Sequence, residues 1–176
     1  MNTTVVSALI AKLTAGCGLV LLLPLLTALF GEEPVLPFIY SMALCFLLSV
    51  FLRYKGKKKV INLNPRDGLA VTALSWICIS ILYLFPYFLS GLLSPLDALV
   101  ESISGLTGTG ATVFADLTVL PKSILFFRSL THWLGGLGII VIFVALFPQA
   151  GKGSARMIDA ESTGPYSSRA AVSYTH

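Results

Sequence analysis

The stretch GLTGTGAT at residues 105–112 places glycine and threonine between two long apolar segments. Such flexible sequence is unusual in a chain that is otherwise built from apolar residues. The chain is 56% hydrophobic and only 11% charged, with a mean hydropathy of +0.87. Soluble globular domains carry about a quarter charged residues. The composition therefore favours a membrane protein, and the glycine–threonine stretch requires an explanation within a membrane.

Four segments reach the length of about 20 apolar residues that a membrane-spanning helix needs. They cover residues 5–30, 35–54, 68–92 and 122–147. An acidic turn, GEEP at 31–34, separates the first two spans, and a basic loop, RYKGKKK at 53–59, follows the second. We expect Pro24 and Pro86 to kink the first and third spans, because proline removes a helical hydrogen bond.

The N-terminal segment is interpreted as an uncleaved span. LTAGC at 13–17 resembles a lipoprotein cleavage site, but a strongly apolar run follows it, where a cleaved protein would begin a polar domain. Cys17, Cys45 and Cys78 all fall inside apolar runs. We interpret them as small apolar residues and not as disulfide partners or metal ligands.

The basic residues predict the orientation of the chain, because cytoplasmic loops carry an excess of lysine and arginine. If the chain crosses at all four segments, ten of its 12 basic residues fall on one side. These are Lys12, Arg53, Lys55, Lys57, Lys58, Lys59, Arg66, Lys152, Arg156 and Arg169. Only Lys122 and Arg128 fall on the other side. We therefore expect the N-terminus, the 53–67 loop and the C-terminal tail in the cytoplasm, with the lipid bilayer and not nucleic acid as the partner of the positive charge.

The segment 93–121 leaves and returns on the outer face, although much of it is apolar. It opens with a helix-start signature, with Ser94 as N-cap, Pro95 at the first helical position and Asp97 in the first turn. ALVESIS continues this helix, which we expect to stop at Gly105. About ten helical residues rise only about 15 Å, half the hydrocarbon thickness. A half-crossing helix followed by irregular backbone is typical of a re-entrant pore loop.

The glycine–threonine run suits a cation. Backbone carbonyls can replace the water shell of K⁺ if successive peptides turn inward, which glycine permits, and threonine adds hydroxyl oxygens. The short helix also points its partially negative C-terminal end toward the membrane interior. The alternatives are a plain extracellular turn and a glycine-rich packing site. A nucleotide site is disfavoured, because GTG lacks the third glycine of a dinucleotide fingerprint and GKGS at 151–154 lacks the spacing of a phosphate loop.

The order of these features resembles a known family. A span, SPLDALVESISGLTGTGAT, and a second span containing THWLGGLGIIVIFVALFP are similar to the first pore repeat of the Trk/Ktr/HKT family of K⁺ transport proteins. The two preceding spans match the extra N-terminal pair of the TrkH branch, and ARMIDAESTGP at 155–165 resembles the cytoplasmic stretch after that repeat. The resemblance covers about residues 1–165. It implies an all-α membrane protein with four transmembrane helices plus a re-entrant pore helix and filter loop between the third and fourth.

The resemblance also implies the ion site. The filter strand would be Gly108-Thr109-Gly110-Ala111-Thr112, with Gly110 as the characteristic filter glycine. The carbonyls of Gly108, Thr109, Gly110 and Ala111 would bind K⁺, with those of Thr109 and Gly110 as the central metal ligands, and Thr107 and Thr112 would flank them. In the TVGYG signature of tetrameric K⁺ channels, a threonine stands in place of Gly108 and a tyrosine in place of Ala111. The filter of this chain could therefore be less selective for K⁺ than those channels.

Further polar residues surround the proposed filter. Arg128 and His132 lie one turn apart on the fourth span. Arg128 is either an interfacial anchor or the partner of Glu101 or Asp97 in bracing the pore helix, and His132 is interpreted as a hydrogen-bonded packing residue. Asp97, Glu101 and Asp116 could form an acidic ring that concentrates cations at the pore mouth. The glycines of the fourth span, Gly135, Gly136 and Gly138, are expected to allow close helix approach.

The resemblance divides the chain into an N-terminal transmembrane helix pair at 1–59, a helix–pore loop–helix repeat at 60–150 and a cytoplasmic linker at 151–176 that looks truncated. It implies K⁺ transport across the bacterial inner membrane, with a cytoplasmic nucleotide-binding regulatory subunit as a partner and no organic cofactor. One loop cannot encircle a pore, so the remaining repeats or like subunits are required. A truncated product, a fragment and a tetramerising subunit remain open, with truncation favoured.

Two other functional classes compete with transport. A non-conducting membrane subunit would use the loop only for packing. An intramembrane enzyme is disfavoured, because the sequence offers no paired catalytic residues.

Overall fold

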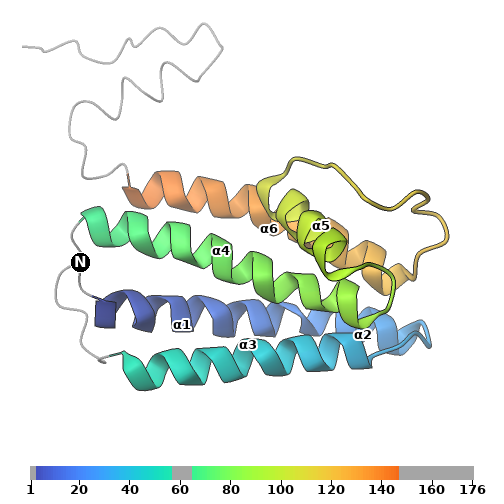
Figure 1. Cartoon of the computed structure of the whole chain (residues 1–176), viewed down its shortest axis with the longest axis horizontal. Helices are drawn as coiled ribbons and strands as arrows, with labels where there is room; N and C mark the ends of the chain where they lie inside the picture. Colours follow the sequence, from blue (N-terminus) through green and yellow to red (C-terminus); the bar gives the residue numbers. More distant parts are fainter. Residues whose placement is uncertain (1–2, 57–64, 147–176) are drawn as a thin grey trace, which may run out of the picture.

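The computed structural model describes residues 3–56 and 65–146, in which every regular element is a helix (Figure 1). The helices are α1 (Thr3–Val20), α2 (Leu22–Phe30), α3 (Leu36–Lys55), α4 (Pro65–Leu89), α5 (Pro95–Thr107) and α6 (Lys122–Leu146). The expected linker at 151–176 and the central part of the basic 53–67 loop lie outside the described residues.

The first expected span contains two helices that are nearly continuous. α1 and α2 meet at Leu21, whose backbone N–H still donates to the Cys17 carbonyl at 3.3 Å. Pro24 follows three residues later and cannot donate to the carbonyl of Val20, which explains the interruption of the helix at this point. By contrast, α4 passes through Pro86 without ending.

Three helical stretches of the described residues are long and apolar enough to cross a membrane, namely Val6–Phe30, Leu36–Tyr54 and Ala70–Leu89. They coincide with the first three expected spans to within three residues at each end. Large apolar side chains on their outer faces are exposed, including Leu19, Leu47 and Val50. Outward apolar faces are typical of helices that contact lipid. The all-helical membrane fold expected from the sequence is therefore confirmed.

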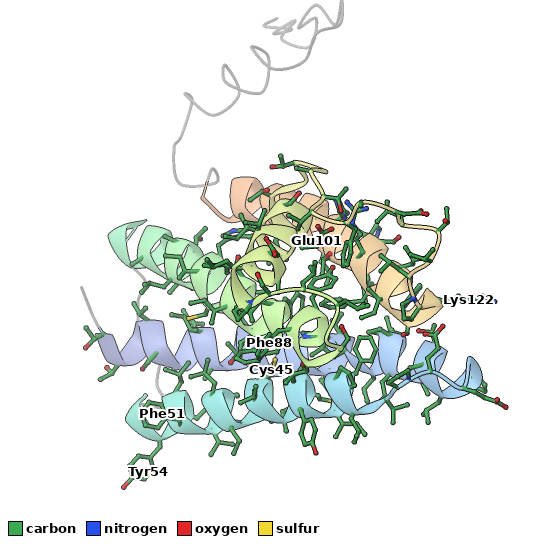
Figure 2. The ribbon with its side chains drawn as sticks, turned by 45° about the vertical axis from the view of Figure 1, so that its right-hand side comes forward. Cys45, Phe51, Tyr54, Phe88, Glu101 and Lys122 are labelled. Atoms are coloured by element: carbon green, nitrogen blue, oxygen red, sulfur yellow. The ribbon has the colours of Figure 1, made fainter. Side chains whose placement is uncertain are left out.

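The long helices run side by side, and the short helix α5 occupies one half of the bundle (Figure 1). α1 packs mainly on α3, while α4 contacts α1, α3, α5 and α6. α5 lies against both α4 and α6, and α2 contacts α6. Tyr54 and Lys122 mark opposite ends of the bundle (Figure 2). The short helix is thus held between the two helices that precede and follow it in sequence.

An aromatic cluster centred on Phe127 joins α6 to α3 and α4. Its ring centroid lies 6.1 Å from that of Phe38, 5.4 Å from that of Tyr83 and 5.2 Å from that of Tyr87. All four side chains are buried. The contacts with Phe38 and Tyr83 are edge-to-face, which matches the positive edge of one ring to the negative face of another. The cluster fixes the rotation of α6 relative to the rest of the bundle.

Hydrogen bonds between helices supplement the apolar packing. The Ser49 hydroxyl donates to the carbonyl of Ala11 at 2.7 Å, which links α3 to α1. The Tyr83 hydroxyl donates to the carbonyl of Cys17 at 3.2 Å, which links α4 to α1. Hydroxyls can bridge helices in this way without a charge that would be costly in lipid.

Two glycines let α5 lie directly on α6. A Cβ atom on Gly105 would come within 2.6 Å of Thr131 Oγ1, and one on Gly135 would collide with the carbonyl oxygen of Leu106. A Cβ on Gly138 would approach the Trp76 ring of α4 at 3.1 Å. Close approach is therefore confirmed for Gly135 and Gly138. Gly136 differs, because no described atom lies within 4 Å of the position that its Cβ would occupy.

We expect Gly135→Ala to destabilise the protein by about 1–3 kcal/mol, because backbone of α5 must shift to admit the methyl group. Gly136→Ala is the matched control, since its methyl group meets open space and alanine favours the helix by up to about 1 kcal/mol. The apparent Tm of the detergent-solubilised protein compares the two variants. Equal Tm values would contradict the close contact between α5 and α6.

Candidate functional site

The start of α5 is fixed by its own sequence. Ser94 has the extended conformation of an N-cap, and its hydroxyl oxygen accepts from the Asp97 backbone N–H at 3.3 Å. The same hydroxyl donates to Asp97 Oδ2 at 2.7 Å, and Pro95 occupies the first helical position. These local bonds satisfy an N–H group that would otherwise lack a partner. The helix start expected from the sequence is confirmed.

The end of α5 differs from the expectation. The helix does not stop at Gly105 but continues to Thr107, so Thr107 belongs to the helix and not to the irregular segment. Gly105 lies inside the helix and packs against Thr131 of α6, a contact that no local signal reveals. Gly108 ends the helix in the left-handed conformation, with φ 69°, and its N–H donates to the Gly105 carbonyl at 3.1 Å. Glycine at this position avoids the clash that a Cβ would cause.

Residues 108–112 form exposed irregular backbone after α5. We call them the filter segment, after the filter strand expected from the sequence. Gly108 and Gly110 both have positive φ, 69° and 76°. Beyond the chain neighbours, no described atom lies within 4 Å of the position of a Cβ at either glycine, so glycine is required here by the backbone conformation and not by packing. The hydroxyls of Thr107 and Thr109 are 2.7 Å apart at the base of the segment.

The carbonyl of Ala111 has a different environment from that expected. It accepts a hydrogen bond from the Ser104 hydroxyl at 2.6 Å, so this oxygen is turned toward α5. Of the four carbonyl groups that the resemblance assigns to an ion, that of Ala111 is thus hydrogen-bonded to the preceding helix. The Thr109 N–H also bonds back to α5, at 3.1 Å from the Ser104 carbonyl. Ser104 therefore holds the filter segment at two points.

Glu101 lies at the centre of the site, between α5 and α6 (Figure 2). Its side chain is completely buried, and Oε1 accepts from Arg128 Nε at 2.5 Å. Oε2 accepts from the Thr112 hydroxyl and from the Val113 N–H, both at 3.0 Å. A buried carboxylate is stable only when it is paired and hydrogen-bonded, and these three donors meet that need. The structure thereby brings α5, the end of the 108–112 segment and α6 together at one side chain.

The structure separates the acidic residues that we had grouped at a pore mouth. Glu101 is buried on Arg128 and cannot form part of an exposed acidic ring, which corrects that expectation. Asp97 bonds to Ser94, so Glu101 is the carboxylate that contacts Arg128. Asp116 is exposed and accepts from the Thr118 N–H and hydroxyl. These hydrogen bonds hold the pKa of Asp116 below its usual range.

His132 lies one turn beyond Arg128 on α6. Its Nδ1 is 2.8 Å from the carbonyl oxygen of Arg128, at hydrogen-bond distance. This contact agrees with its interpretation as a hydrogen-bonded packing residue. Among the described residues, no group of three or more His, Cys, Asp or Glu side chains could hold a metal ion.

Sequence reasoning missed Glu33. Its carboxylate accepts from the backbone N–H groups of Lys122 and Ser123, at 2.7 and 2.8 Å, and so binds the N-terminus of α6. The sequence had indicated only an acidic turn at 31–34. Because Lys122 and Ser123 lie 89 and 90 residues from Glu33 in the sequence, the local pattern carries no signal for the contact.

Residues 37–174 match the TrkH family, described as a cation transport protein. The chain is 38% identical over 152 residues to the Trk system potassium uptake protein TrkG of Escherichia coli K12, covering 85% of this chain and 31% of that protein. It is 35% identical over 143 residues to the Trk system potassium uptake protein TrkH of Halomonas elongata, covering 80% of this chain and 30% of that protein. The chain thus spans about a third of the length of these relatives.

A solved structure has the same fold. The crystal structure of the potassium transporter TrkH from Vibrio parahaemolyticus superimposes with a TM-score of 0.81 at 31% sequence identity. The match covers 91% of this chain and 36% of that one. The sequence matches and the shared fold agree with the resemblance noted in the pore-loop motif, and the chain therefore belongs to the TrkH family of cation transport proteins.

Proposed function

We propose that the chain carries K⁺ across the bacterial inner membrane as one pore unit of a TrkH-type uptake protein. The observation that carries this proposal is the left-handed glycine backbone at the end of α5, anchored to the pore helix through Glu101. The relatives are potassium uptake proteins by name, and the chain matches about a third of their length. We assign that role to this chain from its membership of the family together with this geometry.

In the proposed membrane arrangement, α6 is the fourth span and α5 crosses only part of the bilayer. α6 has 25 residues, a rise of about 37 Å, whereas the 13 residues of α5 rise about 20 Å. Because the hydrocarbon core is about 30 Å thick, α6 is long enough to cross it and α5 is not. The excess of basic residues supports an orientation with the end of the bundle that carries Tyr54 in the cytoplasm and the end that carries Lys122 outside (Figure 2).

The proposed ligands are backbone oxygens of Gly108, Thr109 and Gly110. Positive φ at the two glycines reverses the direction of successive peptides, which lets neighbouring carbonyls turn toward one path. The C-terminal end of α5 adds partial negative charge beside them. The carbonyl of Ala111 is engaged by Ser104 and would contribute less than the other three. Thr112 would serve as the anchor to Glu101.

The chain needs partners to enclose a pore. We propose that further pore repeats, or like subunits, surround the exposed filter segment, and that a cytoplasmic nucleotide-binding subunit regulates the assembly. Within this chain, residues 1–59 form the N-terminal helix pair, 60–150 the pore repeat and 151–176 a cytoplasmic linker. K⁺ is the proposed bound ion, and no organic cofactor is assigned.

The transport proposal is tested by placing the full chain in the matched segment of E. coli TrkG, which we call the TrkG chimera. We expect the TrkG chimera to restore growth of a K⁺-uptake-deficient strain at low K⁺ and to accumulate Rb⁺, because the filter segment completes the pore. The chain alone is the control for independent transport. A TrkG chimera that reaches the membrane in normal amount but accumulates no Rb⁺ would support a non-conducting role.

The filter assignment predicts a change of ion preference in Gly110→Ala. A non-glycine residue in the left-handed conformation costs about 1–2 kcal/mol, so the backbone should leave its native geometry. We expect the preference for K⁺ over Na⁺ in the TrkG chimera to fall at least about fivefold. Gly91→Ala is the matched control, since Gly91 has φ 73° and similar open space but lies outside the filter segment. Its ion preference should stay unchanged.

The bracing role of Glu101 and Arg128 is tested by a double-mutant cycle. Arg128→Gln leaves a buried carboxylate without its cation, which costs about 3–5 kcal/mol. We expect a large loss of membrane-inserted protein and of Rb⁺ uptake in the TrkG chimera. The double variant Glu101→Gln/Arg128→Gln removes both charges and should recover protein amount more than uptake. Arg53→Gln, at the exposed end of α3, controls for loss of a positive charge. Independent, additive effects would refute the bracing role.

A further inference from the structure

The turn between α2 and α3 reaches across the bundle to the start of the pore repeat's last helix. Glu33 Oε1 accepts from the Lys122 N–H at 2.7 Å, and Oε2 accepts from the Ser123 N–H at 2.8 Å. Both N–H groups belong to the first turn of α6, where the helix itself supplies no acceptor. A carboxylate also complements the partial positive charge at this end of the helix. Glu33 thereby joins the N-terminal helix pair to α6.

The backbone of the turn holds Glu33 in this position. Glu32 has φ 55° and is the one non-glycine residue with positive φ among the described residues. The Glu33 N–H then donates to the Ala28 carbonyl at 2.9 Å, and the Gly31 N–H donates to the Thr27 carbonyl at 3.0 Å. This pattern closes the end of α2 and sets the direction in which the next residue leaves. Both the backbone and the carboxylate of Glu33 are therefore fixed.

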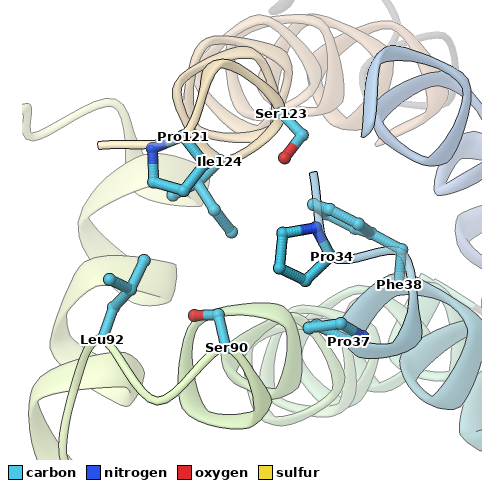
Figure 3. A pocket seen from close by; sticks show the side chains of 8 residues that line it. All are labelled: Pro34, Pro37, Phe38, Ser90, Leu92, Pro121, Ser123 and Ile124. Atoms are coloured by element: carbon cyan, nitrogen blue, oxygen red, sulfur yellow. The ribbon is translucent and has the colours of Figure 1, made fainter. Parts of the chain in front are cut away.

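A small cavity lies beside this half-exposed contact. Pro34, next to Glu33, and Ser123 of α6 face one another across a small, mainly apolar cavity of about 50 Å³ (Figure 3). Burial alone would raise the pKa of Glu33, but hydrogen bonds from Ser123 and Lys122 outweigh it and hold the pKa below its usual value. The carboxylate is therefore ionised whenever the outer medium is near neutral, and the contact is present.

The start of α6 is where the connection that follows the filter segment returns to the bundle. Pro121 precedes α6 and accepts from the N–H groups of Ile124 and Leu125, both at 3.1 Å. One turn beyond them lies Arg128, which binds Glu101, and Glu101 in turn binds the N–H of Val113. A shift of α6 along its axis would therefore move the guanidinium and the end of the filter segment together.

We propose that Glu33 is a positioning residue for ion selection, through which the N-terminal helix pair fixes the axial position of α6 and hence the geometry of the filter segment. This inference rests on the proposed transport function. It assigns to the N-terminal helix pair a part in ion selection.

The first test compares Glu33→Gln with Glu33→Asp and Glu32→Gln in the TrkG chimera. We expect Glu33→Gln to raise the K⁺ concentration for half-maximal uptake about fivefold and to lower the preference for K⁺ over Na⁺, at normal protein amount. Glu33→Asp keeps the charge. Its half-maximal K⁺ concentration and its preference for K⁺ over Na⁺ should therefore lie between those of Glu33→Gln and those of the unaltered TrkG chimera. Glu32→Gln removes the same charge from the adjacent exposed residue and should leave both unchanged.

A second pair of variants tests the contact from the α6 side and is independent of whether Glu33→Gln folds. Lys122→Pro removes one of the two N–H donors, at a helix position that accepts proline, whereas Lys122→Ala keeps the donor. We expect Lys122→Pro to change the K⁺/Na⁺ preference in the same direction as Glu33→Gln, and Lys122→Ala to change it less.

The outcomes separate the two proposals. Loss of protein amount with unchanged K⁺ affinity and ion preference in the surviving protein would make Glu33 merely structural and overturn this inference. Wild-type behaviour of both Glu33→Gln and Lys122→Pro would overturn it as well. In either case transport by the unaltered TrkG chimera would still stand. A TrkG chimera that carries no K⁺ would instead end the proposed function and this inference together.

Discussion

The buried carboxylate of Glu101 is the constraint on which the geometry of the candidate site depends. A charge that is shielded from water must be fully paired, so its surroundings cannot vary freely. Here the pairing groups come from three parts of the chain, namely the Arg128 guanidinium, the Thr112 hydroxyl and the Val113 N–H. Since Thr112 and Val113 follow directly after the flexible glycine backbone, satisfying this one charge also fixes the far end of the filter segment.

The same region requires residues without side chains, for a steric reason. Gly105 packs on Thr131, and Gly135 lies where a Cβ would strike the backbone of α5. At this separation the guanidinium of α6 reaches the carboxylate on α5. The ion pair and the close helix packing are therefore two aspects of one contact, and the aromatic cluster around Phe127 fixes the rotation of α6 that both need.

Polar contacts at the two ends of the 108–121 connection serve different purposes. At its start, Gly108 ends α5 and Ser104 binds the backbone on either side of Gly110. At its end, Glu33 satisfies the free N–H groups of α6 from a different part of the chain. The intervening glycines have open space around them, so the freedom of the filter segment is bounded by its attachments and not by local packing.

The sequence by itself determined the membrane class, the approximate bounds of the first three spans and the start of α5. Lipid requires long apolar helices with internally satisfied backbone, and the Ser94 cap uses only neighbouring residues, so both leave local patterns. It also named Glu101 and Asp97 as candidate partners of Arg128, beside the alternative of an interfacial anchor. Only the tertiary structure chose Glu101, carried α5 past Gly105, turned the Ala111 carbonyl toward Ser104 and placed Glu33 on α6. These features depend on groups brought together from distant parts of the chain or by helix packing, and hydrogen-bond partners of that kind leave no periodicity in the sequence.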